Sequence, residues 1–165
     1  MKLKNTCVIE IKVRLQIDAP LDKVWHVVSK VDDDPQFWKN ITYVKNTSKD
    51  RNIITREVVL GNDIKCSQRI TLFQKEGIHV RWVKGVMTGI KDILLISLDK
   101  ATLVEVQMNY KISGVAQLWY RKITKDLQKE AELALELIKE KAEEKSYNIP
   151  MQQRKSWADL IHGTN

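Results

Sequence analysis

The chain has 165 residues, of which 43% are hydrophobic and three are proline, so it favours one folded domain and excludes a disordered chain. The net charge is +7, and the excess lies in residues 1–115, with 19 Lys and Arg against 13 Asp and Glu. That charge indicates either an anionic partner or a solvated basic face. Charged residues interrupt every apolar stretch, including the one after Met1 where a secretory signal would lie. We therefore expect no transmembrane segment and a cytoplasmic protein.

Residues 7–17 alternate between apolar and polar side chains, which is the pattern of a strand with one buried face. The alternation ends at Asp18-Ala19-Pro20, and proline at a helix start predicts a short helix over residues 21–28. A second helical segment follows over residues 33–38. We interpret the three aspartates at 32–34 as helix-capping residues rather than as a cation site.

From residue 41 onward, apolar segments alternate with turn signals such as Gly61-Asn62-Asp63 and Glu76-Gly77. Such short connections join neighbouring antiparallel strands. The predicted strands lie near residues 41–48, 52–60, 63–73, 78–86, 89–98 and 102–113.

The segment from Ala116 to about Lys145 has the apolar spacing of one long amphipathic helix. A helix with one apolar side needs a large partner surface, which the preceding sheet supplies. We therefore expect a domain over residues 1–145 and a tail over residues 146–165. The tail is either a disordered end or a strap with a short amphipathic helix near Trp157. The predicted buried stripe is Ala116, Trp119, Tyr120, Ile123, Leu127, Ala131, Ala134 and Ile138, with Leu118, Leu133 and Leu135 off it.

Residues 17–25 read Ile-Asp-Ala-Pro-Leu-Asp-Lys-Val-Trp and lie between the first strand and the segment 33–38. With the meander and closing helix that follow, residues 6–145 resemble the START-like superfamily. That superfamily includes pollen-allergen-type proteins, polyketide cyclases/dehydrases and coenzyme-Q-binding proteins. The resemblance implies an α+β helix-grip fold, in which a seven-stranded curved antiparallel sheet wraps round a long C-terminal helix and two short helices follow strand one. It implies a fold and no single activity.

A space between sheet and helix would be lined by the inward phase of each strand, which we assign by apolar content. On this assignment Gln68, Asp92 and Tyr110 point inward, as do Leu94 and Ile96. A few polar groups in an apolar lining are typical of a small-molecule pocket, although strand ends or paired polar groups give the same pattern. The predicted ligand-binding residues are Trp25, Trp38, Gln68, Trp82, Asp92, Met108, Tyr110, Ile123, Leu127 and Ala131.

The sequence offers little for catalysis. Its histidines, His26, His79 and His162, are not spaced as metal ligands, and it has no phosphate-binding loop or nucleophile elbow. We therefore predict no metal site and no cofactor. Asp92 and Tyr110 form the one acid–phenol pair considered for proton transfer, with a purely structural role as the alternative.

Three functions stay open from the sequence. The leading hypothesis is a non-enzymatic protein that binds or transports a hydrophobic small molecule, such as a lipid, isoprenoid or polyketide-like compound. The second is a polyketide cyclase/dehydrase-like enzyme that uses the same cavity. The third is an interaction module whose basic outer face binds RNA, the ribosome or an anionic membrane. The predicted basic residues of that face are Lys12, Arg14, Lys65, Arg69 and Arg81.

Overall fold

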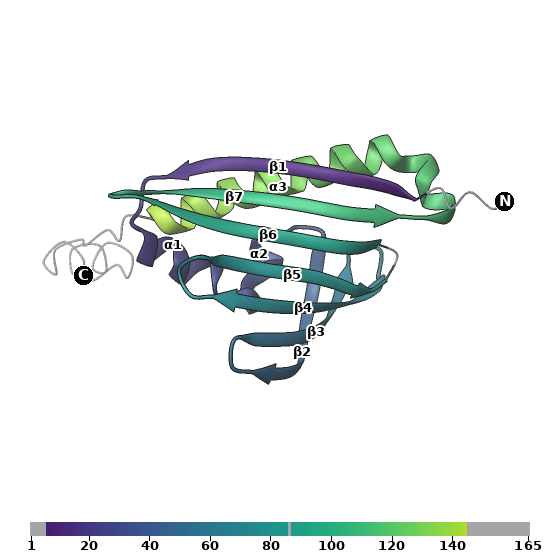
Figure 1. Ribbon diagram of the computed structural model, residues 1–165, viewed down its shortest axis with the longest axis horizontal. Coiled ribbons are helices and arrows are strands. Elements are labelled where there is room, and N and C mark those ends of the chain that lie inside the picture. The colour runs from purple at the N-terminus through teal and green to yellow at the C-terminus, as the bar shows by residue number, and fades with distance from the viewer. Residues whose placement is uncertain (1–5, 86, 145–165) are drawn as a thin grey trace, which may run out of the picture.

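The computed structural model describes residues 6–85 and 87–144, so the predicted tail lies outside the described residues. Its elements follow the predicted order of strand, two short helical segments, six strands and a closing helix (Figure 1). They are β1 Cys7–Ile17, α1 Leu21–Val28, η1 Val31–Asp33, α2 Asp34–Phe37, β2 Ile41–Asp50, β3 Ile53–Leu60, β4 Lys65–Phe73, β5 Gly77–Lys84, β6 Met87–Leu98, β7 Ala101–Ile112, η2 Gly114–Trp119 and α3 Tyr120–Glu143.

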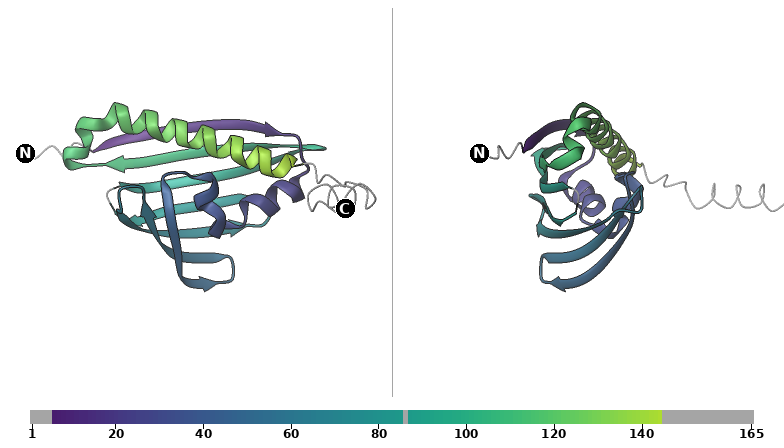
Figure 2. Two further views of the ribbon diagram at one scale, coloured as in Figure 1. Left: turned by 180° about the vertical axis from the view of Figure 1, so that it is seen from behind. Right: turned by 90° about the vertical axis from the view of Figure 1, so that its right-hand side faces the viewer.

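The seven strands form one antiparallel sheet in the order β1-β7-β6-β5-β4-β3-β2. The sheet is curved, and α1, α2 and α3 all lie on one of its faces, as the end-on view in Figure 2 shows. This arrangement confirms the predicted helix-grip architecture. Among the described residues, no helix combines the length and the apolar character needed to cross a membrane.

Helix α3 runs alongside β1 at the edge of the sheet. At one end the Tyr120 hydroxyl donates to the Val8 carbonyl at 3.3 Å, and at the other the Asp18 N–H donates to the Glu143 carboxylate at 2.7 Å. The 24 residues of α3 and the 11 residues of β1 both extend about 36 Å, at about 1.5 Å and 3.3 Å per residue. Because the lengths match, the helix follows the strand from end to end.

The buried face of α3 differs from the predicted stripe in its middle and at its N-terminal end. The prediction is correct from Leu127 to Ile138, but Leu135, which was expected to lie off the stripe, is fully buried. The apolar face is wider than one stripe because α3 packs on α1 and α2 as well as on β1. At the N-terminal end, Ala116 and Trp119 lie in the 3-10 helix η2, which has no buried residue.

The inward phase predicted for β6 is wrong. Leu94 and Ile96 point outward, while Ile93 and Leu95 are buried. Ile93 stands opposite Ile78 on β5 and Val106 on β7, which fixes its side chain on the helix-covered face. Apolar content misleads here because the inward phase also contains Lys91, a residue type that is rarely buried.

Gly89 provides a test of the β6–β7 pairing. Its φ is +136°, and a Cβ at this position would lie 2.2 Å from the Asn109 carbonyl oxygen and 2.8 Å from the Tyr110 Cα. Gly89→Ala should therefore lower the free energy of unfolding by more than about 2 kcal/mol, because backbone atoms of β7 must move. Urea denaturation measures this change.

The matched control is Gly114→Ala. Gly114 has a φ of +69°, but nothing lies within 4 Å of the added Cβ, so only the conformational cost of about 1 kcal/mol is expected. Equal losses in the two variants would contradict the close β6–β7 approach at Gly89.

Candidate functional site

A lysine lies in an otherwise apolar row across the inner face of the sheet. The residues that face one another on successive strands from β1 to β3 are Ile11, Met108, Lys91, Val80, Ile70 and Ile54. Lys91 is only 2% exposed, so its whole side chain is in the interior. A buried ammonium is costly unless other groups replace the water that it has lost.

The contacts of Lys91 replace that water only in part. Its ammonium lies 3.5 Å from the ring centroid of Trp38, in a cation–π arrangement. No hydrogen bond or ion pair joins this ammonium to any residue in the ranges 6–85 and 87–144. Burial lowers the pKa of Lys91 to about 8, although the carboxylates of Asp34 and Glu130 oppose this shift.

Glu130 on α3 is the carboxyl group that faces Lys91 from the helix side. Burial raises the pKa of Glu130 above its usual value, and the positive charge of Lys91 opposes the shift. The two groups influence each other electrostatically without forming an ion pair. The buried cation of Lys91 and the partly buried carboxyl group of Glu130 therefore influence each other without direct contact.

The neighbouring row carries a second set of polar side chains. Trp82 on β5 and Tyr110 on β7 meet across β6 because the residue between them is Gly89, which has no side chain. The Trp82 Nε1 donates to the Tyr110 hydroxyl at 3.2 Å, and their rings pack edge to face at 88° with centroids 6.3 Å apart. Burial raises the pKa of Tyr110 above its usual value.

The same row ends in a buried arginine. Arg56 Nε donates to Gln68 Oε1 at 2.9 Å, Nη1 donates to the Val31 carbonyl at 2.7 Å, and Nη2 pairs with Asp34 Oδ2 at 2.5 Å. These bonds join η1 and α2 to the sheet. Burial raises the pKa of Asp34, and the Arg56 guanidinium opposes that shift. The predicted capping role is not seen for Asp34, because its carboxylate binds Arg56.

Gln68 is left with one unused donor. Its Oε1 accepts from Arg56, but its fully buried Nε2 has no hydrogen-bond partner in the described part of the chain. An unmade hydrogen bond of this kind costs about 1–3 kcal/mol. Gln68 Nε2 and the Lys91 ammonium are thus two donors in the interior that lack acceptors.

Asp92 lies on the opposite face from these groups, which corrects two predictions. Its carboxylate is 2.6 Å from His79 Nδ1 on the outer face of the sheet, whereas Tyr110 points inward. Asp92 therefore neither lines the interior nor forms an acid–phenol pair with Tyr110. The error follows directly from the wrong phase of β6.

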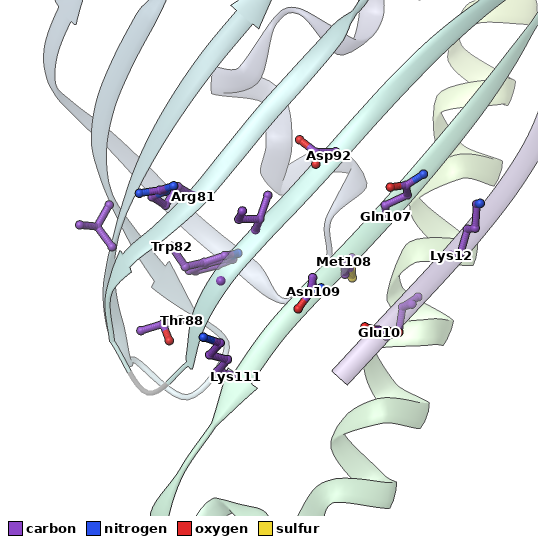
Figure 3. A pocket seen from close by; sticks show the side chains of 14 residues that line it. Glu10, Lys12, Arg81, Trp82, Thr88, Asp92, Gln107, Met108, Asn109 and Lys111 are labelled. Carbon is purple, nitrogen blue, oxygen red and sulfur yellow. The ribbon is translucent and has the colours of Figure 1, made fainter. Parts of the chain in front are cut away.

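The outer face holds an open depression of about 1000 Å³ that both polar and apolar side chains line (Figure 3). Arg81, Asp92 and Lys111 are among the side chains around it. Smaller depressions lie next to His79 and between α2 and the end of α3. None of these three lies between the sheet and the middle of α3, where the sequence placed a pocket, and core side chains pack around Lys91 there.

The predicted basic outer face is partly neutralised. Lys12 and Arg14 both approach Glu105 Oε1, at 3.1 and 3.0 Å. Arg69 and Arg81 stand opposite each other on β4 and β5, exposed to solvent. The exposed positive charge of this face is therefore smaller than the sequence suggests.

Most of the predicted ligand-binding residues do lie in the interior. Two further predicted residues, Trp25 and Ile123, are partly buried against the core, and their binding roles stay predictions. Sequence reasoning missed Arg56, Lys91 and Glu130, although Arg56 shares its phase with Ile54 and Val58. The predicted residues that are buried are Trp38, Gln68, Trp82, Met108, Tyr110, Leu127 and Ala131.

Replacing Lys91 should make the protein more stable. Lys91→Met puts an apolar side chain of similar length into an apolar row, so the free energy of unfolding at pH 7 should rise by about 1–3 kcal/mol. Lys65→Met, at an exposed position, should change it by less than about 0.5 kcal/mol. Urea denaturation distinguishes the two, and a loss of stability in Lys91→Met would show that the ammonium has a stabilising partner.

The pH dependence gives the same site a second readout. The pKa of Lys91 is about 8 in the folded protein and 10.5 in the unfolded chain, so the unfolded chain binds more protons between these values. The free energy of unfolding of the wild type should therefore rise as the pH increases from 8 towards 10.5. Below pH 8 both states hold the proton, so the contribution of Lys91 should level off at its lowest value. The advantage of Lys91→Met should shrink over that range, and a constant difference would contradict the lowered pKa.

Comparison with known proteins identifies the fold. No family model matches the sequence, and no curated protein matches it. The ZhuI aromatase/cyclase from Streptomyces sp. R1128 has a similar structure, with a TM-score of 0.72 and 13% identity over 83% of this chain and 94% of that one. A protein from Thermus thermophilus gives a TM-score of 0.71 and 13% identity over 81% and 96% of the two chains.

Truncated norcoclaurine synthase from Thalictrum flavum gives a TM-score of 0.65 and 12% identity, over 87% of this chain and 99% of that one. At such identities the similarity concerns the fold and not the residues of a site. The strand order, the curved sheet and the long closing helix agree with these structures. The chain therefore has the helix-grip fold.

Proposed function

We propose that this chain binds a small, largely apolar molecule with an oxygen-bearing polar group, in the interior between the sheet and α3. The observation that carries the proposal is the buried ammonium of Lys91, which has no hydrogen-bond partner among the described residues. A lysine in an otherwise apolar row lowers stability, and such costs are typical of binding and catalytic sites.

The groups around Lys91 define the chemistry of the ligand. Lys91 and Gln68 Nε2 offer hydrogen-bond donors, so the ligand should offer acceptors such as a carboxylate, an enolate or a ketone. Trp38, Met108 and Leu127 offer apolar contacts for the rest of the molecule. The similarity in fold to an aromatase/cyclase supports an organic small molecule as the ligand.

Binding requires room next to the ammonium. The Trp38 ring lies directly over the Lys91 ammonium and occupies the position that a ligand oxygen would take. Trp38 directly follows the short helix α2 and belongs to no strand, so a movement of its buried ring would break no hydrogen bond of the sheet. In this proposal the ring covers the cation in the unliganded protein, and the polar group of the ligand replaces it.

A fluorescent fatty acid and its methyl ester provide a matched pair of probes. Wild-type protein should bind the acid at least about tenfold more tightly than the ester, because a hydrogen bond between charged groups contributes about 1.5–3 kcal/mol. Lys91→Met should lose this preference and still bind the ester, whereas Lys65→Met should keep it. Fluorescence titration measures all three proteins, and equal affinity of the wild type for acid and ester would contradict the proposed anchor.

A cyclase-like enzyme is the second candidate, and the Lys91–Glu130 arrangement favours it. Burial lowers the pKa of Lys91 to about 8 and raises that of Glu130, so the pKa values of the two groups lie closer together than in water, which suits an acid–base pair. An enzyme of this kind should accelerate exchange of the α-protons of a 2,4-diketone for deuterium by more than about tenfold. Proton NMR detects the exchange, which Glu130→Gln should abolish. A binding protein alone would show no acceleration, while Glu130→Gln would still bind the fatty acid.

A further inference from the structure

The most exposed apolar side chains of the described chain gather where β7 passes into α3. Val115, Leu118, Trp119 and Tyr120 are 76%, 83%, 59% and 37% exposed, and we call these four residues the apolar cap. The cap lies at the end of the molecule where β1 begins and β7 ends, beyond the sheet in Figure 1. A second group of exposed apolar residues lies on the outer face of the sheet and includes Leu94 and Ile96, which are 37% and 44% exposed.

The backbone explains why residues 6–85 and 87–144 leave the cap exposed. Strand β7 ends at Ile112, and the chain turns at Gly114, where φ is +69°. The 3-10 helix η2 that follows has no buried residue, so it projects from the sheet instead of packing on it. Tyr120 is tied to the domain by its hydroxyl, which donates to the Val8 carbonyl. The cap is therefore a fixed projection with large apolar side chains in water, which marks an interaction site.

The charges that flank the cap in the sequence are positive. Between Glu105 and Asp126 the sequence contains no acidic residue. The same segment contains four basic residues, and each is exposed to solvent. Two of them follow the cap directly on the first turn of α3, and one lies two residues before Ser113 at the end of β7. These basic residues are Lys111, Arg121, Lys122 and Lys125.

We propose that the apolar cap docks onto the surface of an anionic lipid bilayer. Val115, Leu118 and Trp119 would enter the boundary between headgroups and acyl chains, where tryptophan is enriched. Lys111, Arg121, Lys122 and Lys125 would contact the phosphate and carboxylate groups of the lipids. The proposal uses none of the interior groups around Lys91, so it does not rest on the proposed function.

Two other partners fit the cap less well. A nucleic acid would use the four cations and the exposed ring of Trp119, but it gives Val115 and Leu118, the two most exposed side chains of the cap, no apolar surroundings. A protein partner, including a second copy of this chain, would require a broad complementary surface, whereas the cap is a short projection flanked in the sequence by cations. A bilayer accommodates a short apolar projection and the neighbouring positive charge at the same time.

Vesicle flotation tests the proposal with the full chain. The wild type should float with phosphatidylcholine vesicles that contain about 30% phosphatidylserine, and at least about tenfold less with phosphatidylcholine alone. The double variant Leu118→Ser with Trp119→Ser and the double variant Lys122→Glu with Lys125→Glu should each lower the fraction bound by at least about tenfold. All four positions are exposed, and the unfolding transition of each variant confirms that it is folded.

Matched controls separate the cap from general surface effects. Leu133→Ser changes an exposed leucine further along α3, and the double variant Lys65→Glu with Arg69→Glu removes exposed positive charge from β4. Both controls should bind the anionic vesicles within about twofold of the wild type.

Several results would overturn the proposal. The first is that the wild type does not bind the anionic vesicles. The second is that the cap variants bind them as well as the wild type does. The third is that binding is lost only in the control in which Lys65 and Arg69 are changed. If a single-stranded RNA displaced the protein from the vesicles, the cap would be a nucleic-acid-binding surface instead. A dimer in solution that the Leu118 and Trp119 changes disrupt would show that a second copy covers the cap.

Discussion

The register of β5, β6 and β7 brings a lysine side chain into the apolar interior. Val80 and Met108 stand on either side of Lys91, and both point towards the helices. Since side chains alternate along a strand, Lys91 has no route to solvent that does not break this pairing. The placement of its charge is therefore set by backbone hydrogen bonds on both sides, and the elements that cover the face must accommodate it.

The helices and the residue that follows α2 provide the groups that surround the Lys91 ammonium on the side away from the sheet. Strand β1 aligns α3 along its whole length, which sets Glu130 above the row that contains Lys91. The Arg56–Asp34 pair joins α2 to β3, and the Trp38 ring that follows α2 lies over the ammonium. The long helix, the short helix and the sheet each contribute one group to the surroundings of the cation. This convergence favours a binding site over an isolated packing defect.

The sequence predicted the order of strands and helices well, because a regular spacing of apolar residues is compatible with only one type of secondary structure. β1 alternates strictly, and α3 keeps its helical spacing from Leu127 to Ile138. The interior site could be predicted only in part. Even-numbered positions of β6 include Ile90, Leu94 and Ile96, so apolar content alone assigns the wrong face to this strand. Only its pairing with Ile78 and Val106 assigns the correct one. The burial of Arg56 could not be predicted for a similar reason. A charged residue is rarely buried without a partner, and its partner Asp34 comes from a distant segment of the sequence.

Lys91 is a desolvated cation without an anionic partner in direct contact among the described residues. The most direct measurement is a pH titration of the lysine side-chain Cε signals by carbon NMR, with Lys91→Met to assign the resonance. We expect one lysine to titrate near pH 8, well below the ordinary 10.5, and to move upward when a fatty acid is bound. A spectrum in which the Lys91 signal titrates at 10.5 or above, with or without the fatty acid, would contradict the account.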